Sequence, residues 1–186
     1  MSKTKSTSTE IKEILSNLKD LGNARSELDK KAAVAGKDAV GILKDLVTAN
    51  SHILALRWNQ YTPYFDDGDT CEFSVNSLEI QFDDVITGAG DKAGNKKSKE
   101  DDEDEDAESE WVDFGEYGED LKEYFEKRKD VLNYKDLDEL EKAVKAAYDI
   151  HEKLQTMESV LLLAFGDHTQ VTVTRKGIET DSYDHD

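Results

Sequence analysis

The chain of 186 residues has little of several residue types, and each scarcity excludes a class of protein. Cys71 is the one cysteine, which excludes an internal disulfide and a zinc site built from several thiolates. No apolar run approaches the roughly 20 residues of a membrane-spanning helix. Residues 1–9 lack the apolar core of a signal peptide. We therefore expect a soluble protein of a reducing cytoplasm, with no membrane partner.

Basic residues are missing from residues 100–120, a window that holds 13 acidic residues and therefore carries a charge of −13. The whole chain carries −19, which leaves −6 for the remaining residues. A strongly acidic protein repels the phosphates of nucleic acids and of anionic membranes. The charge thus predicts a basic protein partner, such as a nucleic-acid-binding protein, and no direct binding of nucleic acid. The alternative is a solvated loop that only keeps the protein soluble.

The single proline, Pro63, separates a helical hydrophobic pattern from an alternating one. Before it, a first helix is predicted from Thr9 to a stop or kink at Gly22 and Asn23, and residues 24–35 are compatible with a helix. A second helix is predicted over residues 37–58 after an interruption at Gly36. The apolar face of the first consists of Ile11, Ile14, Leu15, Leu18 and Leu21. The second has the alternating steps of three and four that are typical of a helix bundle, at Val40, Leu43, Val47, Asn50, Leu54 and Arg57.

The second half of the chain contains the clearest helical pattern, over residues 135–165, after a shorter helix that begins near Leu121. Its apolar positions again alternate by three and four, which predicts that it pairs with the helix over residues 37–58. These positions are Leu137, Leu140, Val144, Ala147, His151, Leu154, Glu158, Leu161 and Phe165.

Alternation of apolar and polar residues predicts four short strands. Residues 71–75 and 78–82 are predicted to form a hairpin with its turn at Asn76 and Ser77. Residues 171–174 and 178–183 are predicted to form two more strands. The predicted fold class is therefore α+β, with a long antiparallel helical hairpin, additional helices and a small antiparallel sheet at one end.

The domain prediction places one domain around an excursion of low complexity. Residues 1–8 are predicted to be a disordered N-terminus, and residues 9–86 supply helices and the β-hairpin. Residues 87–110 form a disordered acidic loop, because they have almost nothing to bury. Residues 111–186 complete the same domain with helices and C-terminal strands.

Two sets of residues are candidate sites. Acidic residues interleaved with aromatic ones resemble a linear motif that docks into a basic, apolar groove. These partner-binding candidates are Asp101, Asp102, Glu103, Asp104, Glu105, Asp106, Trp111, Phe114 and Tyr117. A candidate ligand corner consists of Trp58, Tyr61, Tyr64, Asp66, Asp67 and Asp69. Its alternative is a small core where helices meet the sheet, followed by an Asp/Gly turn.

No set of residues predicts catalysis, a cofactor or a metal. The acids near Gly68 do not have the spacing of a calcium loop. Cys71 has no histidine nearby in the sequence, and the glycines at 88 and 90 lack the lysine of a phosphate loop. His151, on an apolar helix face, is predicted to be a packed core residue. The protein is therefore predicted not to be an enzyme.

Two stretches carry a resemblance. Residues 58–75, WNQYTPYFDDGDTCEFSV, and residues 166–186, with GDH, VTVTRKG and YDHD, resemble uncharacterised acidic proteins of tailed bacteriophages. The resemblance covers about a third of the chain and brings no activity with it. It implies a phage-encoded protein that acts in the cytoplasm of a bacterial cell or is packaged in a virion.

These observations predict a non-enzymatic protein–protein interaction protein that engages a basic surface and acts as a mimic of nucleic acid. One alternative is a virion or scaffold component that self-associates as a homo-oligomer through its long helices. A second alternative is a protein that binds a small molecule or a metal at the corner formed by residues 58–69.

Overall fold

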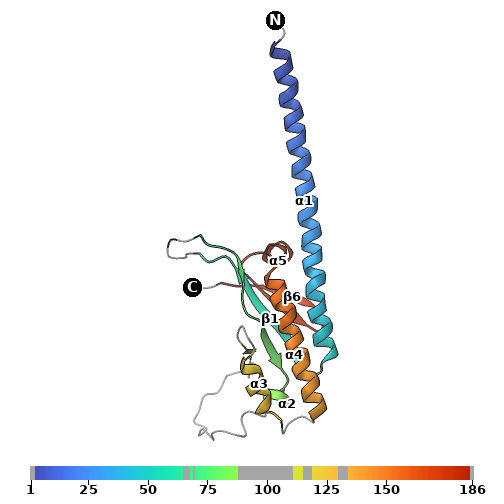
Figure 1. Ribbon diagram of the computed structural model, residues 1–186, viewed down its shortest axis with the longest axis vertical. Helices are drawn as coiled ribbons and strands as arrows, with labels where there is room; N and C mark the ends of the chain where they lie inside the picture. The colour runs from blue at the N-terminus through green and yellow to red at the C-terminus, as the bar shows by residue number, and fades with distance from the viewer. Residues whose placement is uncertain are drawn as a thin grey trace.

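The computed structural model describes residues 3–64, 68, 70–87, 111–114, 119–129 and 134–184, and the fold is α+β (Figure 1). Its elements in chain order are α1 (Lys3–Ala49), β1 (Ile53–Tyr61), β2 (Ser74–Val75), β3 (Glu79–Phe82), α2 (Asp84–Thr87), β4 (Trp111–Asp113), α3 (Glu119–Glu126), α4 (Tyr134–Gln155), α5 (Glu158–Phe165), β5 (Thr169–Thr174) and β6 (Ile178–Ser182).

Helix α1 is one continuous helix of 47 residues, where the sequence predicted separate helices. It begins ahead of the predicted start at Thr9 and continues through both Gly22 and Gly36. A glycine costs a helix only about 1 kcal/mol relative to alanine, which flanking helix-forming residues offset. The C-terminal half of α1 lies beside α4, which runs in the opposite direction (Figure 1). This is the predicted antiparallel helix pair.

The predicted extension of this helix to Trp58 is wrong, because residues 53–61 form strand β1. A bulge between Ile53 and Ala55 shifts the register of pairing with β3. The bulge leaves Ile53 and Leu56 both buried although they are three residues apart. The helix prediction relied instead on Leu54 and Arg57, whose spacing of three also fits a helix, and both side chains are only partly buried.

Strand β1 is the centre of an antiparallel sheet with the order β4-β3-β1-β5-β6, to which β2 adds by pairing with β1. The predicted hairpin at Asn76 and Ser77 is wrong, because β2 and β3 pair with β1 and follow each other along the same edge of it. In the segment that joins β2 to β3, the Asn76 N–H donates a hydrogen bond to Asn59 O of β1 at 2.8 Å. The sheet thus joins segments from both sides of residues 88–110.

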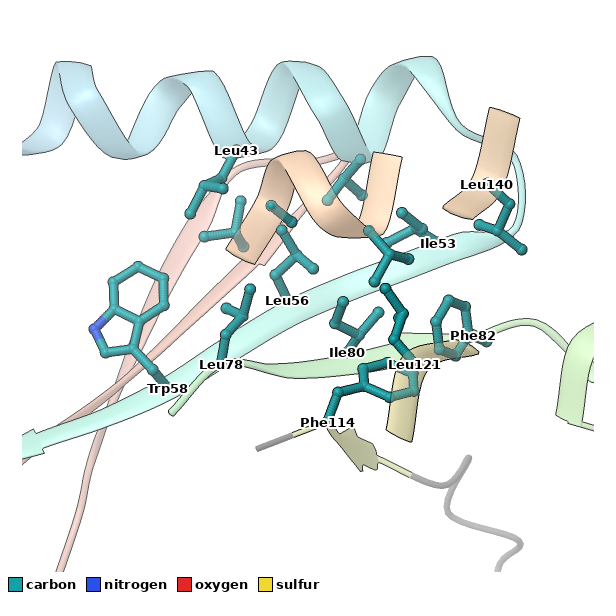
Figure 2. Packing of buried hydrophobic residues seen from close by; sticks show 14 of the residues in the cluster. Leu43, Ile53, Leu56, Trp58, Leu78, Ile80, Phe82, Phe114, Leu121 and Leu140 are labelled. Carbon is teal, nitrogen blue, oxygen red and sulfur yellow. The ribbon is translucent and has the colours of Figure 1, made fainter. Parts of the chain in front are cut away.

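The core lies between the sheet and the helices that cover one face of it. Leu56 on β1 is paired with Val173 on β5 and with Ile80 on β3, so three apolar side chains stand in one row. Figure 2 shows Leu43 of α1 pointing toward this row, with Trp58 at one end of the cluster and Phe82 at the other. The predicted α1 positions Val40, Leu43 and Val47 are all buried.

An arginine from the turn between β5 and β6 holds the C-terminal end of α1. The Arg175 guanidinium donates hydrogen bonds to four carbonyl oxygens, those of Val47, Asn50, Ser51 and Ile53, at 2.7 to 3.3 Å. The last carbonyls of a helix have no partner within the helix, and a cation there also opposes the helix dipole. This contact helps α1 to end where β1 must begin.

The single long helix predicted over residues 135–165 is interrupted at Thr156 and Met157, which form a turn between α4 and α5. The interruption lets α5 pack closely against α1. A Cβ at Gly36 of α1 would lie 2.9 Å from Ala164 Cβ and 3.1 Å from Val160 O, both on α5. The absence of a side chain at Gly36 therefore permits the close approach.

We expect Gly36→Ala to destabilise the protein by about 1–2 kcal/mol, because overpacking of about 1–3 kcal/mol exceeds the gain in helix propensity of up to about 1 kcal/mol. The matched control is Gly41→Ala on the same helix, where a Cβ would meet nothing within 4 Å. That variant should be slightly more stable than the wild type. Urea denaturation of both variants checks the pair, and equal effects would contradict the close packing of α1 on α5.

Candidate interaction surface

The N-terminal part of α1 extends well beyond the rest of the molecule (Figure 1). We call residues 3–35 the stalk and the described residues from Gly36 onward the body. All side chains from Ile11 to Leu28 are exposed, and Gly36 is the first buried residue in the part of the helix from Ile11 onward. Isolated helices are marginally stable in water, and packing of an apolar face supplies most of the stability of helices in proteins.

The stalk carries an apolar stripe, which we call the seam. Its positions are 11, 14, 18, 21, 25 and 28, with the alternating steps of three and four that coiled coils use. Five are large apolar residues with high exposed fractions, namely Ile11 (52%), Ile14 (58%), Leu18 (58%), Leu21 (67%) and Leu28 (66%). Arg25 occupies the remaining position, the fifth in order, and its Nε lies 4.0 Å from Asp29 Oδ2.

Charge separates the stalk from the rest of the chain. Residues 1–35 contain seven basic and five acidic residues, which gives them a net charge of +2. Because the whole chain carries −19, the remaining residues carry −21. Two copies that meet through their stalks bring together nearly neutral surfaces. Two copies that meet elsewhere bring together strongly negative ones, which repel each other. The stalk is therefore the part of the chain best suited to contact another copy.

The sequence predicted the first half of this stripe, from Ile11 to Leu21, as the face of a short helix. It did not connect Arg25 and Leu28 to the stripe, because Gly22 and Asn23 were interpreted as a stop or kink of the helix. The spacing of three and four continues through both residues. That continuation was the signal that identifies the whole seam.

The partner-binding residues predicted from the acidic segment are placed only in part. Asp101, Asp102, Glu103, Asp104, Glu105, Asp106 and Tyr117 lie outside the described residues. Phe114 is only 2% exposed and packs in the core, so the prediction that it contacts a partner is wrong. Trp111 lies on β4, with the Arg57 guanidinium 4.0 Å from the centre of its ring. Arg57 also pairs with Glu79 at 2.6 Å.

The predicted ligand corner is not one site. Trp58 is fully buried on the helix-covered face of β1. Tyr61 lies three residues further along the strand, and because side chains alternate between the two faces, it lies on the opposite face. Asp66, Asp67 and Asp69 lie outside the described residues. The alternative prediction, a core position for the tryptophan, is the one that the structure shows for Trp58.

Tyr61 and Tyr64 instead join an aromatic cluster at the end of the sheet. Tyr64 stacks on His168 with ring centres 4.7 Å apart, and Tyr61 lies 5.4 Å from Tyr183. His168 has a positive φ of 51°, an uncommon conformation for a residue with a side chain. The neighbouring Asp167 accepts hydrogen bonds from the Thr62 N–H and hydroxyl at 2.8 Å, which join the loop after β1 to the turn before β5. These contacts show that the cluster holds the loop after β1 against the turn before β5, which is a structural role.

His151 is a core residue, in agreement with the sequence prediction. It is 2% exposed, and its ring centre lies 5.4 Å from that of Trp58. Nε2 has no hydrogen-bond partner among the residues that the structure describes. Burial lowers the pKa of His151 to about 4, and the negative charge of Asp113 opposes this shift only in part. The histidine is therefore neutral at pH 7.

Within the described part of the chain, no three histidine, cysteine or acidic residues lie close enough together to hold a metal ion. None of the described helices combines the length and the apolar character needed to cross a membrane. Comparisons with protein-family models, curated proteins and solved structures found no match to this chain. The function is therefore inferred from this chain's own structure and sequence.

Proposed function

We propose that this protein is a non-enzymatic assembly protein that self-associates through the stalk of α1. The observation that carries the proposal is the seam, five large apolar side chains at coiled-coil spacing that are all more than half exposed. A second stalk offers the same spacing and almost no net charge. Burying part of an exposed leucine or isoleucine contributes about 1 kcal/mol, and a dimer would bury ten such side chains.

The other function predicted from the sequence, binding of a basic partner by the acidic segment, has less support from the described residues. Of its three aromatic candidates, Phe114 is buried and Trp111 packs on Arg57. Self-association corresponds to the alternative prediction of a scaffold or virion component. The seam that supports it differs from the helix positions on which that prediction relied, around Asn50 and His151, because His151 is buried and Asn50 is partly buried within the same chain.

We expect the double variant Leu18→Asp and Leu21→Asp to abolish self-association. Each copy would place two carboxylates in the middle of the seam, where they repel the partner and lose hydration. Both residues are more than half exposed in the single chain, so the body should fold normally. Sedimentation equilibrium of the full chain should give dimers for the wild type and monomers for the variant.

The matched control adds the same two charges on the opposite side of the stalk, as Ser16→Asp and Asn23→Asp. Both positions are exposed and point away from a two-helix interface that uses the seam. The control should remain dimeric, and the fluorescence of the buried Trp58 should be unchanged in both double variants. A wild-type chain that sediments as a monomer at high concentration would refute the proposed function.

A further inference from the structure

We infer that two copies pair antiparallel through their stalks, so that residue n of one copy lies level with residue 39 − n of the other. This inference rests on the proposed self-association and adds the orientation and register of the pair. Three independent features of the stalk support it: the order of its seam residues, the length of helix outside the body and the distribution of charge.

The seam reads the same in both directions. Its steps of three, four, three, four and three are symmetric about the midpoint between residues 19 and 20. An antiparallel pair centred there places Leu18 level with Leu21, and Ile11 level with Leu28, in each half of the interface. Every layer then combines one residue of the first heptad position with one of the fourth, as antiparallel coiled coils require.

Arg25 distinguishes the two orientations. In a parallel pair in register, each Arg25 would face the other Arg25 across the seam, and two like charges would be partly desolvated together. In the antiparallel pair, Arg25 lies level with Ile14 of the second copy. Its methylene groups can cover that side chain while the guanidinium stays in water beside Asp29 of its own helix.

The length of the stalk fits the same register. From Ile11 onward, Gly36 is the first residue of α1 that is buried in the body. In the antiparallel pair, residue 3 of one copy lies level with residue 36 of the other. The exposed residues 11–28 of the two copies therefore overlap completely, and the body of each copy, from Gly36 onward, begins beyond them.

Charge repulsion favours the antiparallel pair as well. A parallel pair would hold two segments of charge −21 side by side. In the antiparallel pair the two bodies begin 33 residues apart along the helix axis, about 50 Å at 1.5 Å per residue. That separation is about six Debye lengths at physiological ionic strength, so the repulsion between the bodies is largely screened.

The experiment uses single cysteines in full-length chains that carry Cys71→Ser. Ile11→Cys is introduced in one chain and Leu28→Cys in a second chain of different size, distinguished by a tag. The two positions are about 26 Å apart along one helix, whereas a disulfide needs Cα atoms within about 7 Å. We expect the mixture of the two chains to oxidise to a mixed disulfide dimer, and each chain alone to form little disulfide.

The control mixes a Ser16→Cys chain with an Asn23→Cys chain. The two residue numbers also sum to 39, so these residues are level in the antiparallel pair, but they lie on the outer side of the stalk. These chains should not cross-link in either orientation, and sedimentation of all samples under reducing conditions shows whether they associate. Cross-linking of Ile11→Cys and of Leu28→Cys each with itself would establish a parallel pair and overturn the inference while the proposed function stands. Dimers without any cross-link at these positions would also overturn the inference, and monomers would overturn both.

Discussion

Replacement of Trp58 by alanine should destabilise the protein by about 3–5 kcal/mol, a large share of the roughly 5–15 kcal/mol that stabilises a typical domain. Trp58 is fully buried on the central strand, and its ring lies 5.4 Å from that of His151 and 6.4 Å from that of Phe165. Its removal would leave a cavity that β1 cannot move to fill, because the strand is paired with β3 on one side and with β5 on the other. Urea denaturation followed by circular dichroism measures the loss.

A hydrogen-bond network makes part of this loss specific to the indole. Trp58 Nε1 donates to Gln60 Oε1 at 3.3 Å, and Gln60 Nε2 donates to Gly166 O at 2.6 Å, beside the end of α5. Trp58→Phe keeps an aromatic ring but removes the donor to a buried oxygen. It should therefore cost about 1–3 kcal/mol, less than the alanine variant.

The second tryptophan provides the matched control. Trp111 is only partly buried, and the Arg57 guanidinium stacks on it 4.0 Å from its ring centre. Trp111→Ala should cost about 1 kcal/mol, the usual value of such a cation–π contact. If the Trp58 and Trp111 variants lost equal stability, Trp58 would not be the centre of the core.

Acidification from pH 7 to pH 5 should remove about 2 kcal/mol of folding free energy through His151, and about 3 kcal/mol below pH 4. The pKa of this histidine is lowered by burial to about 4 in the folded protein, from an ordinary value of 6.5. The unfolded chain therefore takes up a proton first as the pH falls. The contribution of neutral His151 to stability is complete above pH 6.5 and is lost as the pH decreases toward the pKa of His151 in the folded protein.

Many carboxylates also change charge in this range, so the measurement compares the wild type with His151→Phe at each pH. The difference between their unfolding free energies should change by about 2 kcal/mol between pH 7 and pH 5, in favour of phenylalanine at low pH. His151→Gln, which also cannot be protonated, should give the same slope whatever its stability at pH 7. A difference that does not change with pH would show that His151 is accessible to water and to protons.

The fold class was predictable because its signals are local. The positions Val40, Leu43 and Val47 have helical spacing and are buried, and the alternation at residues 171–174 became strand β5. The burial of His151 followed from its place in a run of apolar positions. The apolar stripe from Ile11 was also visible, although its continuation to Leu28 was missed because glycine was weighted too strongly as a helix stop.

The errors share one physical origin, which is competition between local pattern and long-range pairing. Residues 53–58 have an apolar pattern compatible with a helix, yet pairing with β3 and β5 on both sides makes them the central strand. The expected hairpin at Asn76 failed for the same reason, since β1 offered a longer edge than a two-strand hairpin provides. The sequence also did not predict strand β4, which includes Trp111.

The sequence by itself determined the α+β class, the antiparallel helix pair and the charge distribution, because periodicity and charge are properties of neighbouring residues. Only the tertiary structure decided that Phe114 and Trp58 are core residues and that residues 11–28 of α1 are exposed. Burial depends on which distant segments meet, and no local pattern records that. The exposed seam became a candidate interface only when the fold had assigned Val40, Leu43 and Val47 of the same helix to the core.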